Sequence, residues 1–254
     1  MSRSMTSSPA SAAHAISSAD DAGATPALLG EAAVLIWNDV AAEGRMQFYD
    51  WHDKQHIPER LAIPGFRRGR RYARPGHSPE WLTLYEARDI DVLTSPDYLA
   101  RLNTPTSLTS ATLPYFRRTS RAVCRVVCTQ GSSSGGHALA LRLDGDAAAE
   151  EGFVDHVSTE AFPRALGHTG IVACHLFASD RRGSLIDTAE SRTRQFDVPA
   201  WVIVVEATTP AAAEAARQHL DSVSLRERAV RLRDDAAVYT LEICRLGTLE
   251  QPRR

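Results

Sequence analysis

Short apolar runs and longer amphipathic segments follow one another along this chain in an order that occurs twice. In the first occurrence, apolar runs typical of strands lie at 33–37, 66–74, 81–88 and 121–127. Apolar spacing typical of helices covers 95–102 and 43–61, the latter ending just before Pro64 and Gly65. The polar residues 75–78 predict a hairpin turn between the second and third strands. The predicted order is therefore βαββαβ.

The same order recurs in the second part of the chain, with strands predicted at 137–143, 169–178, 200–207 and 238–246 and helices at 147–166 and 210–223. Residues 48–65 align with 153–170 at an offset of 105, with five identities in 18 positions. At an offset of 120, residues 81–87 align with 201–207 with three identities in seven. Chance gives roughly one identity in 15. The chain therefore contains a degenerate tandem repeat, with an insertion in the second half within residues 179–199.

The βαββαβ order is the split βαβ arrangement, a four-stranded antiparallel sheet with two helices on one face. The other face needs a cover, and the equivalent face of the second half is the simplest one. Strand 171–177 is apolar at both parities, which is typical of a strand covered on both sides. We expect an α+β fold in which two ferredoxin-like halves pack sheet to sheet within one chain.

The expected halves span residues 31–129 and 137–248. Residues 130–136 (QGSSSGG) are typical of a flexible linker, and residues 1–30 are rich in Ser and Ala and are interpreted as a disordered leader. Because each sheet covers the other, we expect a monomeric pseudo-dimer, which leaves other surfaces for a further homodimer.

Residues 51–66 (WHDKQHIPERLAIPGF) carry a specific motif, in which histidine, a hydrophobic residue and proline precede Pro-Gly-Phe and a strand rich in arginine and tyrosine. This motif resembles the helix-to-strand signature of the dimeric α/β-barrel superfamily, in particular its EthD-like group. The second half keeps Pro163, Leu166 and Gly170 but has Ala161 in place of the histidine. The resemblance implies an intramolecular dimeric α/β barrel. It implies little about the reaction, because the superfamily includes cofactor-free monooxygenases, lactone isomerases, polyketide cyclases, haem enzymes and members of unknown function.

Two histidines stand on one stripe of the first predicted helix. Phe48, His52 and His56 recur every four residues, and their counterparts in the second half are apolar: Phe153, Val157 and Ala161. An unsatisfied buried imidazole costs roughly 1–3 kcal/mol, so the pair indicates a polar pocket between helix and sheet. His56 is the candidate acid or base, because imidazole titrates near neutral pH. His52 is a second candidate, and Asp53 is placed to orient His56. The alternative is a structural His56 that hydrogen bonds within the fold.

The four-residue spacing of His52 and His56 also suits a pair of metal ligands. The residue after His52 is Asp53 rather than glutamate, however, and the sequence assigns no third ligand. A haem ligand is allowed by the superfamily, but one histidine is not a haem signature. We therefore expect no cofactor and no metal, and keep haem and metal as alternatives.

The second predicted strand alternates, with Phe66, Arg68, Arg70 and Tyr72 on one face. Guanidinium groups in a covered sheet are suited to clamp a carboxylate through paired hydrogen bonds. Arg68, Arg70 and Tyr72 are therefore candidate substrate contacts, which would favour an anionic ligand. The alternative is that the arginines pair with acids of the fold, of which the nearest candidates are Glu59, Glu86 and Asp89.

Trp81 and Tyr85 on the third strand are candidate walls of the pocket. Trp81 has a counterpart in Trp201, and a tryptophan present in both halves is more typical of a core position. Glu86 likewise has a counterpart in Glu206, in the half that lacks the histidines, and both are interpreted as structural.

Composition narrows the classes of function. The formal net charge is -2, without the basic excess of a nucleic-acid binder. Lys54 is the single lysine, and it lies outside any phosphate-loop motif, which argues against P-loop and Schiff-base enzymes. No apolar run reaches the roughly 18 residues of a membrane span. The four cysteines form no metal or disulfide pattern, so we expect reduced thiols and a cytoplasmic protein.

These observations favour an enzyme of the isomerase, cyclase or lyase type, acting without a cofactor through proton transfer by His56. Its substrate would be a small organic acid, a lactone, or an aromatic or polyketide-like metabolite. The first alternative is a noncatalytic protein that binds a small ligand or has a purely structural barrel, and the second is a cofactor-free monooxygenase. Because His52, His56, Arg68 and Arg70 occur only in the first half, we expect one site per chain, in that half.

Overall fold

The computed structural model describes residues 27–145, 150–193, 197–220 and 230–248. Most of the expected leader, residues 1–26, lies outside this part. Ala27 and Leu28, which we assigned to the leader, are buried with exposures of 4% and 3%, and Leu28 packs inside the barrel described below. The folded part therefore includes residues that precede the predicted boundary at residue 31.

The N-terminal half contains the predicted strands and helices together with additional short helices. In chain order it consists of β1 (Ala32–Val40), η1 (Ala42–Gly44), α1 (Arg45–Trp51), η2 (His52–His56), α2 (Ile57–Leu61), β2 (Phe66–Ala73), β3 (Trp81–Ala87), η3 (Ile90–Thr94), α3 (Pro96–Asn103), α4 (Ser107–Thr112), η4 (Leu113–Tyr115) and β4 (Phe116–Gly131). Helix α3 begins after Ser95, whose hydroxyl caps it by accepting a hydrogen bond from the amide of Tyr98.

The C-terminal half contains the same order of strands and main helices. It consists of β5 (His137–Gly145), α5 (Glu150–His156), η6 (Val157–Ala161), α6 (Phe162–Leu166), β6 (Ile171–Ser179), α7 (Arg181–Ser184), η7 (Ala189–Thr193), β7 (Trp201–Ala207), α8 (Pro210–Leu220), β8 (Val230–Leu232) and β9 (Ala237–Leu246). The ends of two predicted helices, residues 147–149 and 221–223, lie outside the described part of the chain.

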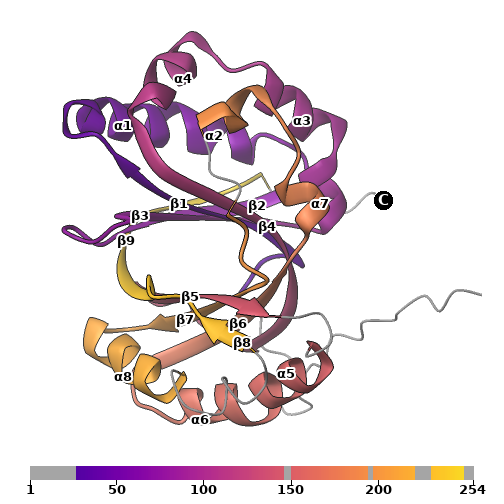
Figure 1. Cartoon of the computed structure of the whole chain (residues 1–254), viewed down its shortest axis with the longest axis vertical. Coiled ribbons are helices and arrows are strands. Elements are labelled where there is room, and N and C mark those ends of the chain that lie inside the picture. The colour runs from indigo at the N-terminus through magenta and orange to yellow at the C-terminus, as the bar shows by residue number, and fades with distance from the viewer. Residues whose placement is uncertain (1–26, 146–149, 194–196, 221–229, 249–254) are drawn as a thin grey trace, which may run out of the picture.

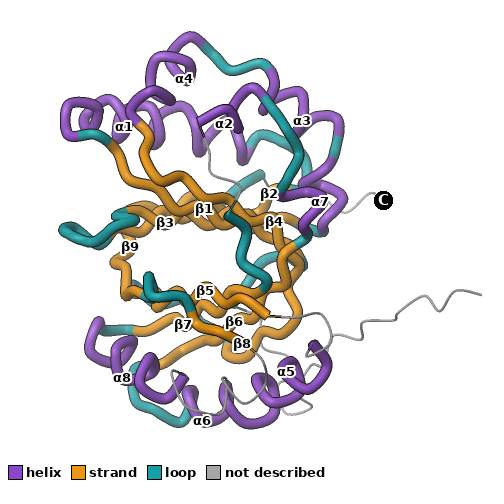
Figure 2. Tube along the Cα trace, viewed as in Figure 1, coloured by secondary structure: helices purple, strands orange, loops and turns teal. Residues whose placement is uncertain are grey.

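Eight antiparallel strands form a closed barrel, and the fold class is α+β. Hydrogen-bonded neighbours follow the order β7-β6-β4-β1-β3-β2-β9-β5, and β5 closes the ring by pairing with β7. Strand β8 pairs with β5 outside this ring. The helices lie outside the barrel in two layers on opposite sides of it (Figure 1), and the strands form a ring between them (Figure 2). The two faces that we expected to pack on each other are thus the inner walls of one barrel, joined at both edges.

Side chains from both halves fill the middle of the barrel. They form one cluster that includes Leu35, Trp37, Tyr72, Leu84, Ala140, Phe177, Val204 and Tyr239. Residues from both parts of the sequence therefore share one core inside the barrel. The opposite faces of the strands carry separate apolar clusters under the helices of each half.

The second strand of each half has a bulge at the same place. The register shifts between Phe66 and Arg68 in β2 and between Ile171 and Ala173 in β6. The extra residue turns Phe66 to the helix side, where its ring contacts Tyr85, while Arg68 faces the barrel. The prediction that Phe66 and Arg68 share a face is therefore wrong, because strict alternation does not survive a bulge.

The first helix of each half also has one wide π turn, at His52–His56 and at Val157–Ala161. Each helix leads into a glycine with positive φ, Gly65 at 93° and Gly170 at 89°. A Cβ atom at Gly65 would lie 2.5 Å from Cγ2 of Val92, so both the backbone conformation and the space require glycine there.

The segment between β6 and β7 belongs to the C-terminal half in sequence but lies against the N-terminal half (Figure 1). Helix α7 binds β4, where the Ser184 hydroxyl accepts a hydrogen bond from the amide of Val123 at 2.9 Å. Helix η7 continues along α3, and the Ala189 amide donates to Oδ1 of Asn103 at 3.2 Å. The predicted insertion thus reaches the helical side of the other half. Of the described helices, none is long and apolar enough to span a membrane.

Candidate functional site

A small pocket lies between the first helix of the N-terminal half and the outer face of its sheet. Its lining residues are Ile36, Asn38, Phe48, Trp51, His52, His56, Thr83, Leu113, Phe116, Thr119 and Glu190. The cavity volume is about 40 Å³, enough for a few water molecules and roughly a tenth of the space in ordinary small-molecule pockets. Aromatic rings and two imidazoles thus surround a compact space.

His52 is held in one orientation from two sides. Nη1 of Arg71 lies 2.9 Å from Nδ1 of His52 and must donate, because a guanidinium has no acceptor. The ring proton is therefore on Nε2, which lies 3.5 Å from the hydroxyl of Tyr85. Burial, together with the positive charges of Arg71 and Arg60, lowers the pKa of His52 well below its usual value. His52 is accordingly a neutral imidazole at physiological pH.

His56 lies one π turn further along the helix, with an exposure of 7%. Its ring stacks on that of His52 with centroids 5.5 Å apart, and His52 stacks on Phe48 at 5.2 Å. The ring centroid of Trp51 lies 4.2 Å from that of His56, and the centroid of Tyr85, in a T-shaped arrangement, lies 6.4 Å away. The structure therefore brings the two predicted histidines together on one wall of the pocket.

Asp53 takes a different position from the one we predicted. Its carboxylate accepts a hydrogen bond from Nη1 of Arg71, the group that also binds His52. Nε of Arg71 donates to Oε2 of Glu242 at 2.8 Å. Asp53 therefore holds the arginine that orients His52, and its observed ion pair is with Arg71 rather than with His56.

The two predicted wall residues on β3 lie on the same side of the sheet as the histidines. Trp81 is fully buried, packs on Phe48 with centroids 5.0 Å apart and carries the guanidinium of Arg45 at 4.6 Å. Tyr85 is almost fully buried, and burial raises the pKa of its hydroxyl, which stays protonated. Tyr85 reaches His52 directly, whereas Trp81 supports the helix from behind Phe48.

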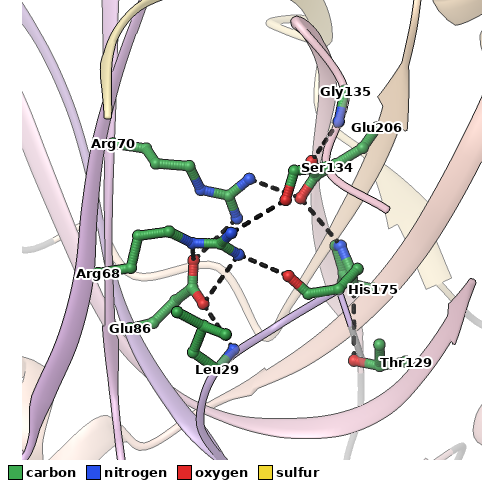
Figure 3. A network of polar contacts seen from close by, with 10 residues as sticks. Leu29, Arg68, Arg70, Glu86, Thr129, Ser134, Gly135, His175 and Glu206 are labelled. Carbon is green, nitrogen blue, oxygen red and sulfur yellow. Dashed lines mark hydrogen bonds and ion pairs between the residues drawn. The ribbon is translucent and has the colours of Figure 1, made fainter. Parts of the chain in front are cut away.

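Arg68, Arg70 and Tyr72, predicted as substrate contacts, point into the barrel and thus lie on the opposite side of the sheet from the histidines. Arg68 binds both carboxylate oxygens of Glu86, at 2.7 and 3.1 Å. Arg70 forms an ion pair with the same Glu86 at 2.9 Å and donates to Oε1 of Glu206 at 2.7 Å. Figure 3 shows this network at one end of the barrel. The interpretation in which the arginines pair with acids of the fold is the one that the geometry supports.

The same network contains His175 and the predicted linker. Nε2 of His175 lies 3.1 Å from Oε1 of Glu206, and the amide of Gly135 donates to Oε2 at 2.8 Å. Burial alone would raise the pKa of Glu206, but His175 and Arg70 hold it at about 2. Ser134 accepts a hydrogen bond from Arg68 at 3.0 Å. The linker is therefore attached to the barrel at this end.

Sequence reasoning missed two charged residues next to the pocket, Arg60 and Glu190. Arg60 is four residues beyond His56 on the stripe that we identified, and the corresponding residue of the other half is Ala165. Extending the stripe by one turn would have found it. Glu190 lies in the inserted segment, far away in the sequence, and its two carboxylate oxygens lie 2.6 and 2.7 Å from Nη2 of Arg60. Nothing in the sequence pattern indicated that contact.

The metal alternative has no geometric support in the described part of the chain. There, no group of three or more His, Cys, Asp and Glu side chains is arranged to hold a metal ion. His52 Nδ1 is already occupied by Arg71, which leaves the pair without a shared open side.

No family model matches the sequence, and no curated protein matches it. Among solved structures, an anthrone oxidase-like protein matches with a TM-score of 0.56 and 13% identity over 89% of this chain and 97% of that chain. A chlorite dismutase variant from Candidatus Nitrospira defluvii matches with a TM-score of 0.52 and 12% identity over 84% and 92% of the two chains. A protein from Thermus thermophilus described as heme-binding matches with a TM-score of 0.48 and 11% identity over 86% and 95%.

The expectation of a site without a cofactor is contradicted by this comparison, because matches with TM-scores of 0.51 and 0.52 include structures described as chlorite dismutases. A porphyrin does not fit the pocket as it stands, since about 40 Å³ is far below the volume of a macrocycle site. At the equivalent place in the C-terminal half, Phe153, Val157 and Phe162 pack on the sheet within an apolar cluster. Neither the pocket nor this apolar cluster is therefore assigned as a haem site in this conformation.

The comparisons and the barrel agree on architecture. Matches at identities this low establish a shared fold and nothing finer, so they do not distinguish an EthD-like group within it. This chain forms an eight-stranded closed antiparallel barrel with helices on two sides, and the anthrone oxidase-like protein matches it over 89% of its length. The chain shares its overall fold with these solved structures.

Proposed function

We propose that this chain is an enzyme that transfers a proton on a small, flat, unsaturated compound in the pocket of His52 and His56. One observation carries the proposal: two buried, stacked imidazoles line a pocket at a place where the other half packs Val157 and Ala161. The C-terminal half packs apolar residues at the same two positions, so the fold by itself does not require imidazoles there. A function for the pair is the simplest reason to retain them.

The two imidazoles have different roles in this proposal. His56 is the acid or base, because its ring lies on the pocket wall and imidazole exchanges a proton near neutral pH. His52 is fixed as a neutral ring by Arg71, and its Nε2–H is a hydrogen-bond donor. Its role is to bind or polarise an oxygen of the substrate and to hold the ring of His56 in place.

The lining of the pocket supports a flat substrate with few polar groups, and the present cavity of about 40 Å³ must widen to admit one. Phe48, Trp51 and Phe116 supply aromatic walls, which favour an aromatic or polyketide-like compound. Thr119 is buried, and its hydroxyl has no hydrogen-bond partner among the described residues, so it is available to a substrate oxygen. A small organic acid or a lactone with a conjugated ring satisfies the same lining.

An oxidation is the second candidate, because an anthrone oxidase-like protein shares this fold. Both candidates place the base at His56, and they differ in whether oxygen is consumed. An oxygen electrode separates them: an isomerase, cyclase or lyase leaves dissolved oxygen unchanged during turnover, whereas a monooxygenase lowers it in proportion to product.

Haem binding is tested separately, since the matching structures include a protein described as heme-binding. Titration of the full chain with hemin, followed by the Soret band, measures it directly. A shifted, saturable band that is lost in His56→Ala would assign haem to this pocket. A band that survives in His56→Ala would place haem elsewhere, and no saturable band would leave proton transfer as the first candidate.

The proposal includes the finer description of the chain. We propose a fused pair of ferredoxin-like halves of EthD-like type, residues 31–129 and 137–248, that is complete as a monomer. Support comes from the shared π turns, the shared bulges and the strand orders β4-β1-β3-β2 and β9-β5-β7-β6. A cytoplasmic location is part of the proposal, because the cysteines are free thiols and three of them are buried. Light scattering at low concentration that shows only dimers would contradict the monomer.

The decisive experiment screens hydroxylated aromatic acids, lactones and polyketide-like compounds by thermal shift and then analyses products. His56→Ala should lower the turnover of a hit by roughly 100-fold to 10,000-fold without unfolding the chain. His156→Gln is a matched control, because His156 is a buried histidine of the first helix in the C-terminal half. Unchanged turnover with a lowered unfolding midpoint in His56→Ala would show that His56 is structural. A ligand that stabilises the chain without forming product would favour the noncatalytic binding alternative.

A further inference from the structure

Arg60 carries a hydrogen-bonding group that the fold leaves unused. Its side chain is 97% buried between α2 and the ring of Tyr98, whose centroid lies 5.9 Å from the guanidinium carbon. Both oxygens of Glu190 contact a single nitrogen, Nη2, at 2.6 and 2.7 Å. Nη1 is buried and has no hydrogen-bond partner among the described residues. A guanidinium fork binds a carboxylate best through two nitrogens, and here Nη1 of Arg60 takes no part in binding the carboxylate.

The position of Arg60 connects it to the pocket. Arg60 follows Phe48, His52 and His56 at the same four-residue spacing, and its charge contributes to the lowered pKa of His52. In the other half, Ala165 fills this place and is fully buried. A buried cation at this position of the first helix is therefore specific to the half that contains the pocket.

Glu190, the partner of Arg60, belongs to a segment that is attached by polar contacts. It lines the pocket together with the two histidines. Around it, Ala189 donates to Asn103, and the carbonyl of Gly183 accepts from Nη1 of Arg121 at 3.2 Å. Leu185, between these contacts, is 43% exposed. Such contacts can exchange with water at lower cost than an apolar interface. A buried guanidinium without a counter-ion is unstable, however, so Glu190 leaves Arg60 only when another anion takes its place.

We propose that Arg60 is the anion-binding residue of the pocket and that the carboxylate of Glu190 occupies the place of the ligand's anionic group. The ligand is a flat conjugated compound with a carboxylate or another anionic oxygen, which binds the fork of Arg60 while its ring lies against the aromatic walls beside His56. Displacement of Glu190 also enlarges the cavity from its present size. This inference deepens the proposed function and rests on it for the identity of the site.

Calorimetric titration of the full chain with benzoate and with the neutral benzamide tests the proposal. Glu190→Gln removes the competing charge and keeps the shape, so it should bind benzoate roughly 10-fold more tightly than the wild type, with benzamide changed less than about twofold. Adding Arg60→Met to Glu190→Gln should abolish that gain. Glu160→Gln, on the exposed side of the first helix of the C-terminal half, is the matched control and should change neither affinity.

Equal effects of Glu190→Gln on benzoate and benzamide, or no binding of benzoate to Glu190→Gln, would overturn the proposal. If Arg60→Met does not fold, Glu190→Gln alone decides, with a second readout: benzoate should raise its unfolding midpoint more than that of the wild type. A benzoate preference that depends on Arg60, without any reaction in the product screen, would support this inference and count against the proposed enzyme. Turnover of neutral compounds without a benzoate preference would support the proposed enzyme and count against this inference.

Discussion

The first helices of the two halves have the same backbone but different interiors. Both contain a π turn, both end before a glycine with positive φ, and both pack on the outer face of four strands. In the C-terminal half the stripe after Phe153 is Val157, Ala161 and Ala165, part of an apolar cluster. In the N-terminal half the stripe after Phe48 is His52, His56 and Arg60, which lies beside a cavity. The π turn is therefore a feature of both helices, whereas the side chains on it determine whether the helix borders a pocket.

The largest expected effect comes from giving the N-terminal stripe the residues of the other half. The double variant His52→Val, His56→Ala removes the proposed base and its neighbour, so turnover should fall by roughly 100-fold to 10,000-fold. The fold should remain, because the same residues pack well at 157 and 161. Steady-state kinetics with circular dichroism checks both statements. Retained turnover in a folded double variant would show that the reaction does not take place in this pocket.

A stability effect of similar size is expected at a feature that both halves share. Glu206→Gln leaves Arg70 and His175 with a weakened partner inside the barrel, and breaking a buried ion pair costs roughly 3–5 kcal/mol. Turnover per folded molecule should be unchanged, since this network lies on the other side of the sheet from His56. Urea unfolding measures the cost, with Glu160→Gln as the surface control. A loss of turnover without a loss of stability would show that the network has a functional rather than a structural role.

The reverse exchange should have a smaller effect on stability. Placing histidines in the C-terminal stripe, Val157→His with Ala161→His, introduces imidazoles into an apolar cluster. Each unsatisfied polar group costs roughly 1–3 kcal/mol, and overpacking adds to it. The free energy of unfolding should therefore drop by about 2–4 kcal/mol, measured by urea denaturation. If the variant is as stable as the wild type, the apolar interior does not exclude a polar site.

The smallest effect concerns pH. The folded pKa of His52 is held well below its usual value by burial, Arg71 and Arg60, so the unfolded chain takes up a proton below pH of about 6.5 that the folded chain does not. Stability should therefore fall as pH drops below about 6.5, by at most about 1.4 kcal/mol per pH unit from this group. Urea unfolding at several pH values in wild type and His52→Phe measures the difference. An identical pH dependence in both would show that His52 titrates normally.

The order of strands and main helices could be predicted from apolar spacing, because each strand and helix must bury one face whatever surrounds it. Strands β2 and β3 and the first helix lie within a residue or two of their predicted bounds. The histidine stripe was found in the same way, by comparison of residues 48–61 with their counterparts. Local errors arose where backbone geometry interrupts a simple period: the bulge after Phe66 changed the face of that residue.

The pairing of the charged residues in and near the site depends on contacts between segments that lie far apart in the sequence. The sequence by itself determined which residues of the helix are polar where the other half is apolar, because that comparison needs only the alignment. The tertiary structure alone decided that Arg68 and Arg70 bind Glu86 and Glu206 inside the barrel, because those acids come from other strands. It alone brought Glu190 from the inserted segment, 130 residues away, to Arg60. Charge pairing acts over a few ångströms in space and leaves no periodicity in the chain, so such partners follow from the fold and not from a pattern.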